Sequence, residues 1–523
     1  MVKDIESFIK EDQMVRRFAV ARKDQIWDPH RPIYHYQNPE YRMNDPNGLS
    51  FWNGNWHLFY QAYPEGEGIQ HWGHTFSKDL VHWRDLPYAI SPGPEKACLS
   101  GNTLVEEDRV IAMYGGIKQG VMAAVSSDPY LMDWEKVTGR AVIPYHWSDD
   151  FYRRPDMGVP VDREHPELQA FDSSIFKKDG MYYAICGGRR LNGPKDRIVR
   201  AHFLFRSPNL EEWEYLHPFV EEDIFTMVGD DGGCPNFLPI GDRHILIFFS
   251  HVSASQYLLG DYDKQRDKFV ATSHGRFNFG AVNPGGIHAP TATSDSDGSV
   301  IVIFNINPAR IGPPGMIMSL PRRLSLTGQD EIKMEPAGDI QSLRRKHVHV
   351  GRKLLPANKE IVLDQVNGNA MEIVANIKAS GAPMVEMNVF RSPDREEITR
   401  ISFYRNRGFI NRGHREGPRY SLVSIDSSYS SLGGTVPSRA PETASVAIEE
   451  DEDLNLRIFI DKSVLEVYVN NKQCVAVRVY PGVHSTGVSL RSQGLDSELI
   501  SLDAWDMENI YKDTEDLLLD RVL

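Results

Sequence analysis

Three aspartates stand at the beginning of strand-like segments, where their carboxyl groups could act together. Asp45 lies in YRMNDPNGLSFW, Asp172 in QAFDSSIFKKDG and Asp231 in DDGGCPNFLPIG. Aspartate is common in turns, so each one taken alone fits a structural role. If the three converge on one cavity, they supply what a pocket for a sugar ring needs, because glycosidic cleavage uses one ionised and one protonated carboxyl group.

Several side chains near these acids could hold a substrate. Those that could bind sugar hydroxyls are Gln61, His74, Ser100 and Asn102, while Trp72 fits either an apolar wall for the sugar or the protein core. Hydrogen bonds from Asn44 and nearby backbone amides would keep the pKa of Asp45 low, as an attacking carboxylate requires. Arg322 in MSLPRRLSL fits a structural role as well as a functional one.

The segments that carry these residues are short, apolar and interrupted by Gly, Pro, Asn and Asp, which is typical of β-structure. Clear examples are NWHLFYQAY, VIAMYGG, MYYAICGG, HILIFFSH and SVIVIFNIN. A weak repeat links SKDLVHW at 77–83, SDPYLMDW at 127–134 and SPNLEEW at 207–213. Recurrence at roughly 50 residues or more predicts a β-propeller, in which the starts of the innermost strands meet around a central channel.

The pattern changes around residues 335–355, which are polar and charged. Beyond them, AMEIVANIK, RISFYRN and LRIFIDKSVLEVYVNN alternate apolar and polar residues, which predicts a β-sandwich. VLEVYVNNKQCVAVRVY predicts a hairpin that turns at Asn-Asn, and the Ser-, Gly- and acid-rich segment 422–453 predicts a long exposed loop. We therefore expect a helical extension at 1–25, a propeller at 26–340, a linker at 341–355, and a sandwich with a short tail at 356–523.

Composition and charge argue against several classes of function. The 523 residues carry a formal net charge of −14, which repels nucleic acids and anionic membranes. No apolar run is long enough to span a bilayer, and the first residues lack the apolar stretch of a secretion signal. The four cysteines are widely spaced, which argues against a disulfide framework or a zinc site and favours the cytoplasm. We expect no metal and no cofactor.

The order of the motifs resembles a known family. MNDPNG, LFYQ, WGHTFSKDLVHW, SGN at 100–102, MSLPRRLSL and LRIFIDKSVLEVYVNN are similar to segments of the glycoside hydrolase family of invertases, levanases and other β-fructofuranosidases, known as family 32. The resemblance implies an all-β chain, with a five-bladed β-propeller followed by a C-terminal β-sandwich. It also implies a retaining reaction in which Asp45 attacks the anomeric carbon.

Two motifs depart from the family pattern. The family's Arg-Asp-Pro is replaced by Phe171-Asp172-Ser173, which keeps the acid that holds sugar hydroxyls and stabilises the transition state. An RRPD sequence at 153–156 competes with it but does not precede the expected strand. The family's Glu-Cys-Pro, whose Glu is the acid/base, is replaced by Gly233-Cys234-Pro235. We expect Asp231 to replace this Glu, with Asp230 as the competitor, because the glycines that follow can carry the acid inward.

These expectations identify a hydrolase that cleaves terminal β-D-fructofuranosyl units from sucrose or short fructo-oligosaccharides. A fructosyltransferase and a furanosidase of another kind, such as an arabinofuranosidase, remain open as alternatives. The lost Glu also leaves open a catalytically silent carbohydrate-binding protein. The expected partner is a small carbohydrate, and the sandwich face offers a contact surface for a homo-oligomer.

Overall fold

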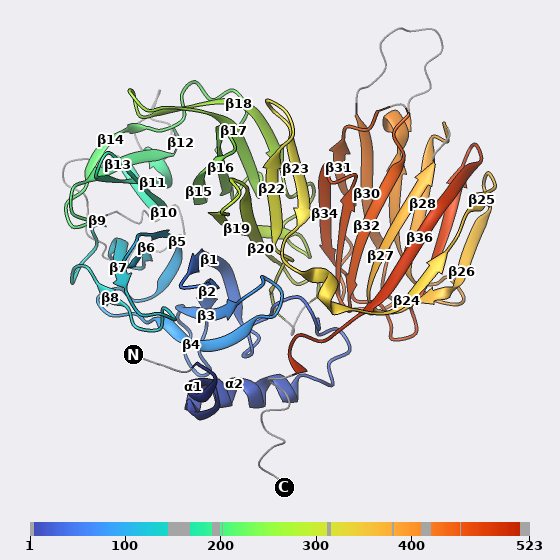
Figure 1. Cartoon of the computed structure of the whole chain (residues 1–523), viewed down its shortest axis with the longest axis horizontal. Coiled ribbons are helices and arrows are strands. Elements are labelled where there is room, and N and C mark those ends of the chain that lie inside the picture. The colour runs from blue at the N-terminus through green and yellow to red at the C-terminus, as the bar shows by residue number, and fades with distance from the viewer. Residues whose placement is uncertain are drawn as a thin grey trace.

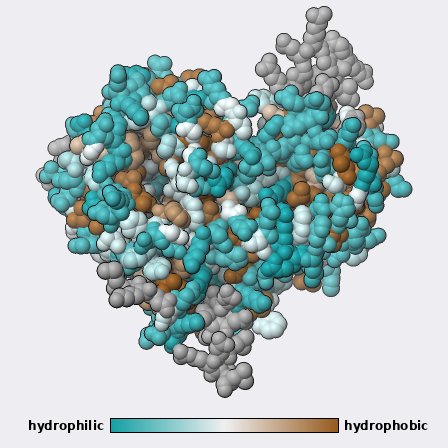
Figure 2. Space-filling view, in the orientation of Figure 1, coloured by the Kyte–Doolittle hydropathy of each residue, from teal (hydrophilic) through white to brown (hydrophobic). Residues whose placement is uncertain are grey.

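The computed structural model describes residues 5–144, 168–190, 199–200, 202–227, 229–310, 315–378, 381–408, 420–449 and 451–512. Its strands form two bodies that lie side by side, with a pair of short helices beneath the first body (Figure 1). The face seen in Figure 2 is covered mainly by hydrophilic residues, with smaller hydrophobic areas between them. Within the described ranges, no helix is long and apolar enough to cross a membrane.

The helices at the N-terminus are attached to the first sheet. They are α1 (Ile5–Glu11) and α2 (Gln13–Asp24). The side chain of Asp12 caps α2 by accepting two backbone hydrogen bonds from its first turn. Arg22, fully buried on α2, forms a two-pronged ion pair with Asp85, with N–O distances of 2.6 and 2.7 Å. This pair fixes the helix to the outer strand of the first sheet.

The larger body is a propeller whose described part has five antiparallel sheets, or blades, arranged in a ring. Blade 1 contains β1 (Met43–Trp52), β2 (Asn55–Ala62), β3 (His71–Ser77) and β4 (Arg84–Ile90). Blade 2 contains β5 (Cys98–Val105), β6 (Val110–Gly116), β7 (Gly120–Ser126), β8 (Glu135–Lys136) and β9 (Ile143–Pro144). Blade 3 contains β10 (Leu168–Lys178), β11 (Met181–Arg190), β12 (Val199–Arg200), β13 (Phe203–Ser207) and β14 (Glu214–Pro218).

The remaining two blades complete the ring. Blade 4 contains β15 (Gly233–Ile240), β16 (Arg243–Phe249), β17 (Gln256–Asp263) and β18 (Lys268–Arg276). Blade 5 contains β19 (Ile287–Ser294), β20 (Val300–Ile306), β21 (Ile317–Met318), β22 (Arg322–Leu326) and β23 (Ile332–Pro336). The five apolar runs noted in the sequence are the second strands of the five blades, β2, β6, β11, β16 and β20. They are mainly apolar because neighbouring blades cover both of their faces.

The weak sequence repeat marks one turn that recurs in blades 1, 2 and 3. In each blade a serine at or just before the repeat (Ser77, Ser126 and Ser207) ends the third strand, and its hydroxyl accepts a 3.2 Å hydrogen bond from the backbone two residues later. A leucine then adopts the left-handed conformation, at φ 64° for Leu80, 52° for Leu131 and 72° for Leu210. The repeat therefore specifies how the chain turns into the outermost strand of a blade.

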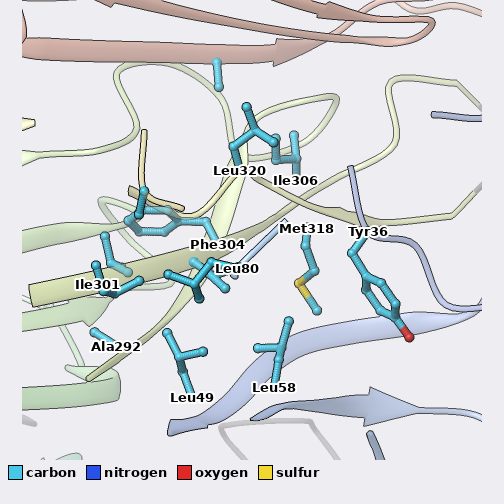
Figure 3. Close-up of a cluster of buried hydrophobic side chains, with 14 of the residues drawn as sticks. Tyr36, Leu49, Leu58, Leu80, Ala292, Ile301, Phe304, Ile306, Met318 and Leu320 are labelled. Atoms are coloured by element: carbon cyan, nitrogen blue, oxygen red, sulfur yellow. The ribbon is translucent and has the colours of Figure 1, made fainter. Parts of the chain in front are cut away.

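Side-chain packing closes the ring between blades 5 and 1. Leu49 and Leu58 of blade 1 face Ala292, Ile301 and Phe304 of blade 5 in one buried cluster (Figure 3). The cluster continues into the second body, so the same apolar contact closes the propeller and attaches its neighbour.

The second body is a sandwich of two antiparallel sheets. One sheet contains β24 (Arg344–Val350), β25 (Lys353–Leu355), β36 (Ser497–Met507), β27 (Ala370–Lys378), β32 (Leu454–Asp461), β33 (Val464–Val469) and β34 (Gln473–Arg478). The other contains β26 (Glu360–Asn367), β35 (Gly487–Gln493), β28 (Met384–Arg391), β29 (Ile398–Tyr404), β30 (Ser421–Tyr429) and β31 (Glu442–Val446). Short 3-10 helices occupy Ile340–Leu343 and Arg405–Gly408. The prediction of a propeller followed by a sandwich is confirmed.

The sandwich confirms one local prediction and corrects another. β33 and β34 form the predicted hairpin, and both Asn470 and Asn471 have positive φ, as a tight hairpin turn requires. The expectation of a long exposed loop at 422–453 is wrong, because β30 and β31 pair within it. Their small polar residues alternate with inward apolar ones, including Val423 and Ala444, and this weak alternation is sufficient at a sheet edge.

A buried charge network joins the two bodies. Arg322 of blade 5 is fully buried and lies 2.8 Å from Glu466 of the sandwich. His35 contacts Asp461 at 2.9 Å and Glu466 at 3.2 Å. Of the two roles open to Arg322, the structure therefore gives it the structural one.

Candidate active site

The innermost strands bring distant segments together at the centre of the propeller. They are β1, β5, β10, β15 and β19, and each contacts the innermost strands of both neighbouring blades. Figure 1 shows their labels around the middle of the ring. These strands therefore surround one central space, although more than half of the propeller's residues lie between β1 and β19 in the sequence.

Each innermost strand has an irregular step in its pairing with the second strand, at its first residues in β1, β5, β15 and β19 and after Phe171 in β10. A bulge of this kind leaves residues out of the ladder and redirects their side chains. The residues inside the five irregular steps include Asp45, Ser100, Asp172, Cys234 and His288. Every blade thus contributes one polar or thiol side chain to the central space.

Asp45, on β1, is surrounded by donors. Ser100 Oγ donates a 2.6 Å hydrogen bond to Asp45 Oδ2, and Gln61 Nε2 lies 3.3 Å from the same oxygen. The other oxygen lies 3.0 Å from Nδ1 of His288. Burial alone would favour the protonated acid, but His288 and then Ser100 hold the pKa of Asp45 below its ordinary value. Asp45 is therefore ionised at neutral pH, as a nucleophile must be.

Asp172, on β10, has a different environment. Its backbone is in the left-handed region, with φ 42°, a strained conformation that aims the carboxyl group inward. Asp172 Oδ2 accepts a 2.9 Å hydrogen bond from the amide of Cys234. Burial, opposed by this amide and reinforced by the negative charge of Asp45, raises the pKa of Asp172 to about 7. Near neutral pH, Asp172 therefore holds a proton for part of the time.

Cys234 links the two acids. Its Sγ lies 3.7 Å from Asp45 Oδ2 and 3.5 Å from Asp172 Oδ2. Burial and the two neighbouring carboxyl groups raise the pKa of Cys234 well above its ordinary value. The group between Asp45 and Asp172 is therefore a neutral thiol, which separates their charges without adding one.

Asp230 and Asp231 are both buried, and they bind different residues of the turn that follows β16. Asp230 accepts 2.6 Å hydrogen bonds from the hydroxyls of Ser250 and Ser253. Asp231 is fully buried, and its two oxygens lie 3.1 Å from the backbone nitrogen and 2.8 Å from Nδ1 of His251. Asp231, the predicted proton donor, therefore reaches the site through a histidine instead of exposing its own carboxyl group.

The two glycines that follow Asp231 have separate physical roles. Gly232 has φ +63°, and a Cβ atom on it would lie 2.4 Å from Nε2 of His202, so a larger residue does not fit. A Cβ atom on Gly233 would instead meet Asp172 Oδ2 at 3.4 Å and the carbonyl oxygen of Phe249 at 3.6 Å. A side chain at position 233 would therefore enter the site beside Asp172.

Trp72 and His74, two predicted substrate contacts, lie in the core of blade 1. The exposed fraction of each is zero. The indole of Trp72 packs against Phe59 and Tyr114, and its Nε1 donates to the carbonyl of Leu99. The ring of His74 contacts His57, and burial holds its pKa well below the ordinary value. From these positions neither side chain can touch a sugar, because both point between blades and not into the central space.

Of the other predicted contacts, some touch Asp45 directly and others support the residues around it. Gln61 and Ser100 hold Asp45, as described above. Asn102 donates a 2.5 Å hydrogen bond to Asn236, which in turn donates to the carbonyl of Cys234. Asn102 therefore supports the site indirectly, through Asn236 and Cys234. Asn44 is not among the groups that chiefly lower the pKa of Asp45. The competing RRPD at 153–156 lies outside the described residues.

The sequence did not predict three side chains of this site. They are His251, His288 and Cys234, the last of which contacts both acids. One signal for His288 was present. Pro46, Pro235 and Pro290 each follow a site residue by one or two positions, and proline inside a sheet is confined to edges and irregular steps. No comparable signal marks His251, which reaches the site only because β16 pairs with β15. Within the described ranges, no group of three or more His, Cys, Asp or Glu side chains is arranged to hold a metal ion.

Comparison with known families gives matches over nearly the whole chain. The family model described as "Glycosyl hydrolases family 32 N-terminal domain" matches residues 35–336. The model described as "Glycosyl hydrolases family 32 C terminal" matches residues 339–506. The boundary between the two matches falls just after β23, where the propeller ends.

Individual proteins give the same result. The chain is 25% identical to a levanase from Bacillus subtilis over 93% of this chain and 72% of the relative. It is 25% identical to a sucrose-6-phosphate hydrolase from the same organism, over 90% of this chain and 94% of the relative. A solved structure, fructan 1-exohydrolase IIa from Cichorium intybus, superposes with a TM-score of 0.76 at 21% identity, covering 93% of this chain and 98% of the other.

Proposed function

The chain belongs to glycosyl hydrolase family 32, and on that premise we propose that it cleaves terminal β-D-fructofuranosyl units from sucrose or short fructo-oligosaccharides. Relatives named levanase, fructan 6-exohydrolase and sucrose-6-phosphate hydrolase support this substrate class. The observation that carries the proposal is the pair Asp45 and Asp172, linked by the Cys234 thiol at the centre of the propeller.

In the proposed retaining reaction, Asp45 acts as the nucleophile. Its ionised carboxylate attacks the anomeric carbon of the fructosyl unit and forms an ester, while the leaving oxygen takes a proton. Ser100 and Gln61 hold Asp45 Oδ2, so attack requires little rotation of the side chain. Water then releases the fructose from the ester with retention of configuration.

Asp172 has the supporting role. Its oxygens lie beside the nucleophile, where the ring hydroxyls of a bound fructosyl unit would come within reach. A sugar hydroxyl that donates to Asp172 would stabilise the ionised form of this acid and lower its pKa from about 7. Substrate binding would thereby place a second negative charge near the anomeric carbon as positive charge develops there.

The proposal is tested by incubating the intact protein with sucrose, kestose, inulin and levan, with free fructose as the readout. We expect release from sucrose or kestose, slower release from the polymers, and β-fructofuranose as the first anomer in NMR spectra recorded during the reaction. Asp45→Asn serves as the inactive control. Sugar binding without release would contradict the proposal and favour a silent binding protein. Transfer of fructose to another sugar, or cleavage confined to arabinofuranosides, would favour the two enzyme alternatives.

Two further expectations stay predictions. They are a cytoplasmic location and self-association through the sandwich face. Fractionation of cells and measurement of the mass in solution would test them directly.

A further inference from the structure

The reaction proposed above needs a group that gives a proton to the leaving oxygen and later takes one from water. Asp45 is ionised, and Cys234 is a thiol whose pKa lies far above neutrality. Asp172 is assigned to the sugar hydroxyls in the proposed reaction, and Asp231 is fully buried behind His251. We propose that the imidazolium of His251, oriented by Asp231, is the proton donor and acceptor of this enzyme. This inference rests on the proposed function and assigns the one role that the family's missing Glu leaves open.

Asp231 fixes His251 at two points. One carboxylate oxygen faces the backbone nitrogen of His251 at 3.1 Å, and the other faces its ring Nδ1 at 2.8 Å. Two contacts to one carboxylate restrict both the turn and the ring. With Nδ1 directed at Asp231, Nε2 lies on the opposite edge of the ring, and the side chain as a whole is 55% exposed. A histidine paired in this way with a buried carboxylate is held in a single tautomer and is stabilised when it becomes charged.

His251 lies on the same side of the site as His288, the residue that pairs with the nucleophile Asp45. The ring of Phe249 is 5.1 Å from that of His251 and 4.3 Å from that of His288, measured between ring centroids. His288 in turn contacts Asp45 at 3.0 Å. Phe249 is also the residue that pairs with Gly233 at the start of blade 4. His251 therefore lies in the turn just after β16, the strand that borders the site.

The glycine at 233 leaves room for this arrangement. A side chain there would begin 3.4 Å from Asp172 Oδ2 and 3.6 Å from the carbonyl of Phe249, between Asp172 and the strand that leads to His251. Because position 233 has no side chain, a leaving group bonded to the fructosyl unit can occupy the space between the acids and the imidazole.

The charges around His251 favour its protonated form. Burial alone would lower the pKa of His251, but the hydrogen bond and charge of Asp231, and then the charges of Asp172 and Asp45, raise it above the ordinary value. The other titratable groups nearby include Asp230, bound to Ser250 and Ser253 of the same turn, His288 across Phe249, and His202, which interacts with Asp231. These charges favour the imidazolium of His251 over the neutral ring.

The proposed steps balance in atoms and charge. In the first, the Nε2–H bond breaks as the proton moves to the glycosidic oxygen, whose bond to the anomeric carbon breaks as Asp45 forms the ester. In the second, Nε2 takes a proton from water while the water oxygen attacks the anomeric carbon, and the bonding electrons of the ester return to Asp45. His251 is again an imidazolium at the end of the cycle.

His251→Asn tests the donor, because asparagine keeps a polar side chain but has no acidic proton. We expect kcat/KM for sucrose to fall about 10²- to 10⁴-fold. For β-D-fructofuranosyl fluoride, whose leaving group needs little protonation, we expect a loss below about tenfold. Retained cleavage of the fluoride also shows that the variant is folded. Unchanged turnover of sucrose, or an equal loss on both substrates, would overturn the donor role.

The chain offers a matched control in blade 1. His82 Nδ1 lies 2.7 Å from Asp79, and its side chain is 48% exposed, but this pair sits in the turn between β3 and β4 at the outside of the blade. We expect His82→Asn to leave kcat/KM for sucrose within about twofold of the wild-type value, as is usual for a surface substitution. If the wild-type protein cleaves neither sucrose nor the fluoride, the proposed function itself fails and the donor role falls with it.

Asp231→Asn tests the positioning residue through pH. The acid form of His251 is needed for the first step, so the alkaline limb of the kcat/KM profile on sucrose should follow its pKa. Removing the Asp231 charge should move that limb to lower pH, while Asp79→Asn should not move it. An unshifted limb in Asp231→Asn would overturn the pairing. In the background of His251→Asn, Gly233→Glu should restore part of the sucrose activity, because it introduces a carboxyl group beside Asp172.

Discussion

Asp45 and Asp172 occupy the same place in two different blades, yet their carboxyl groups have opposite properties. Each lies in an irregular step of an innermost strand, in blade 1 and in blade 3. The pKa of Asp45 is held below its ordinary value, whereas the pKa of Asp172 is raised to about 7. The position of an acid within a blade therefore does not determine its charge.

The difference comes from the neighbouring blades. Asp45 faces His288 of blade 5 and Ser100 of blade 2, which together outweigh the effect of burial. Asp172 faces the amide and thiol of Cys234, and also the negative charge of Asp45. Two acids that share a small space cannot both ionise at low cost, so the one with stronger donors keeps the charge.

The largest expected effect is that of Asp45→Asn. Because an amide cannot form the ester, we expect kcat to fall by at least about 10⁴-fold on sucrose and also on the fructosyl fluoride. Steady-state kinetics on both substrates measure this loss. A variant that keeps more than about a hundredth of wild-type activity on the fluoride would exclude Asp45 as the nucleophile.

A smaller effect is expected for Asp172→Asn. The amide keeps the shape and neutrality of the protonated acid but cannot supply negative charge in the transition state. We therefore expect a loss in kcat of about 10²-fold, clearly less than that of Asp45→Asn. Equal losses in the two variants would show that the roles of the two acids are not separated as their pKa values indicate.

The smallest expected effect is on the pH dependence of stability. In the unfolded chain Asp172 loses its proton near pH 4, whereas the folded protein keeps it up to about pH 7. Across this interval the folded state binds more protons, so the stability contributed by Asp172 is complete below about pH 4 and is lost as the pH rises to about 7. Thermal melts of the wild type and Asp172→Asn between pH 4 and 8 measure it.

Asp45→Asn tests the coupling of the two acids in the same melts. The negative charge of Asp45 helps to raise the pKa of Asp172, so removing it should lower the pKa of Asp172 and reduce the pH dependence of stability that Asp172 contributes. A Tm difference between the wild type and Asp172→Asn that stays constant from pH 4 to 8 would contradict a raised pKa for Asp172.

Much of the fold could be predicted from the sequence because its signals are local. Runs such as VIAMYGG and SVIVIFNIN are apolar on both faces, which fits a strand that is covered on both sides, and each proved to be the second strand of a blade. The repeat in blades 1 to 3 has a local cause too, since the serine hydroxyl and the left-handed backbone of the leucine form the turn. The strands at 422–453 were missed because small polar residues give a weak alternation.

The site could be predicted only in part. Asp45, Ser100 and Gln61 lie in motifs specific enough to be placed together. Trp72 and His74 lie in an equally specific motif, but residue type does not distinguish a side chain that points into the channel from one that points between blades. That direction depends on the pleat and on the bulge in each innermost strand.

The sequence alone determined the propeller, the sandwich and the acids Asp45 and Asp172, because periodicity, turn chemistry and a specific motif order are properties of the chain itself. Tertiary structure decided which acid is charged, and it placed Asp231 behind His251. Both outcomes depend on burial and on charges from other blades, and these arise only when segments far apart in the chain meet around one axis.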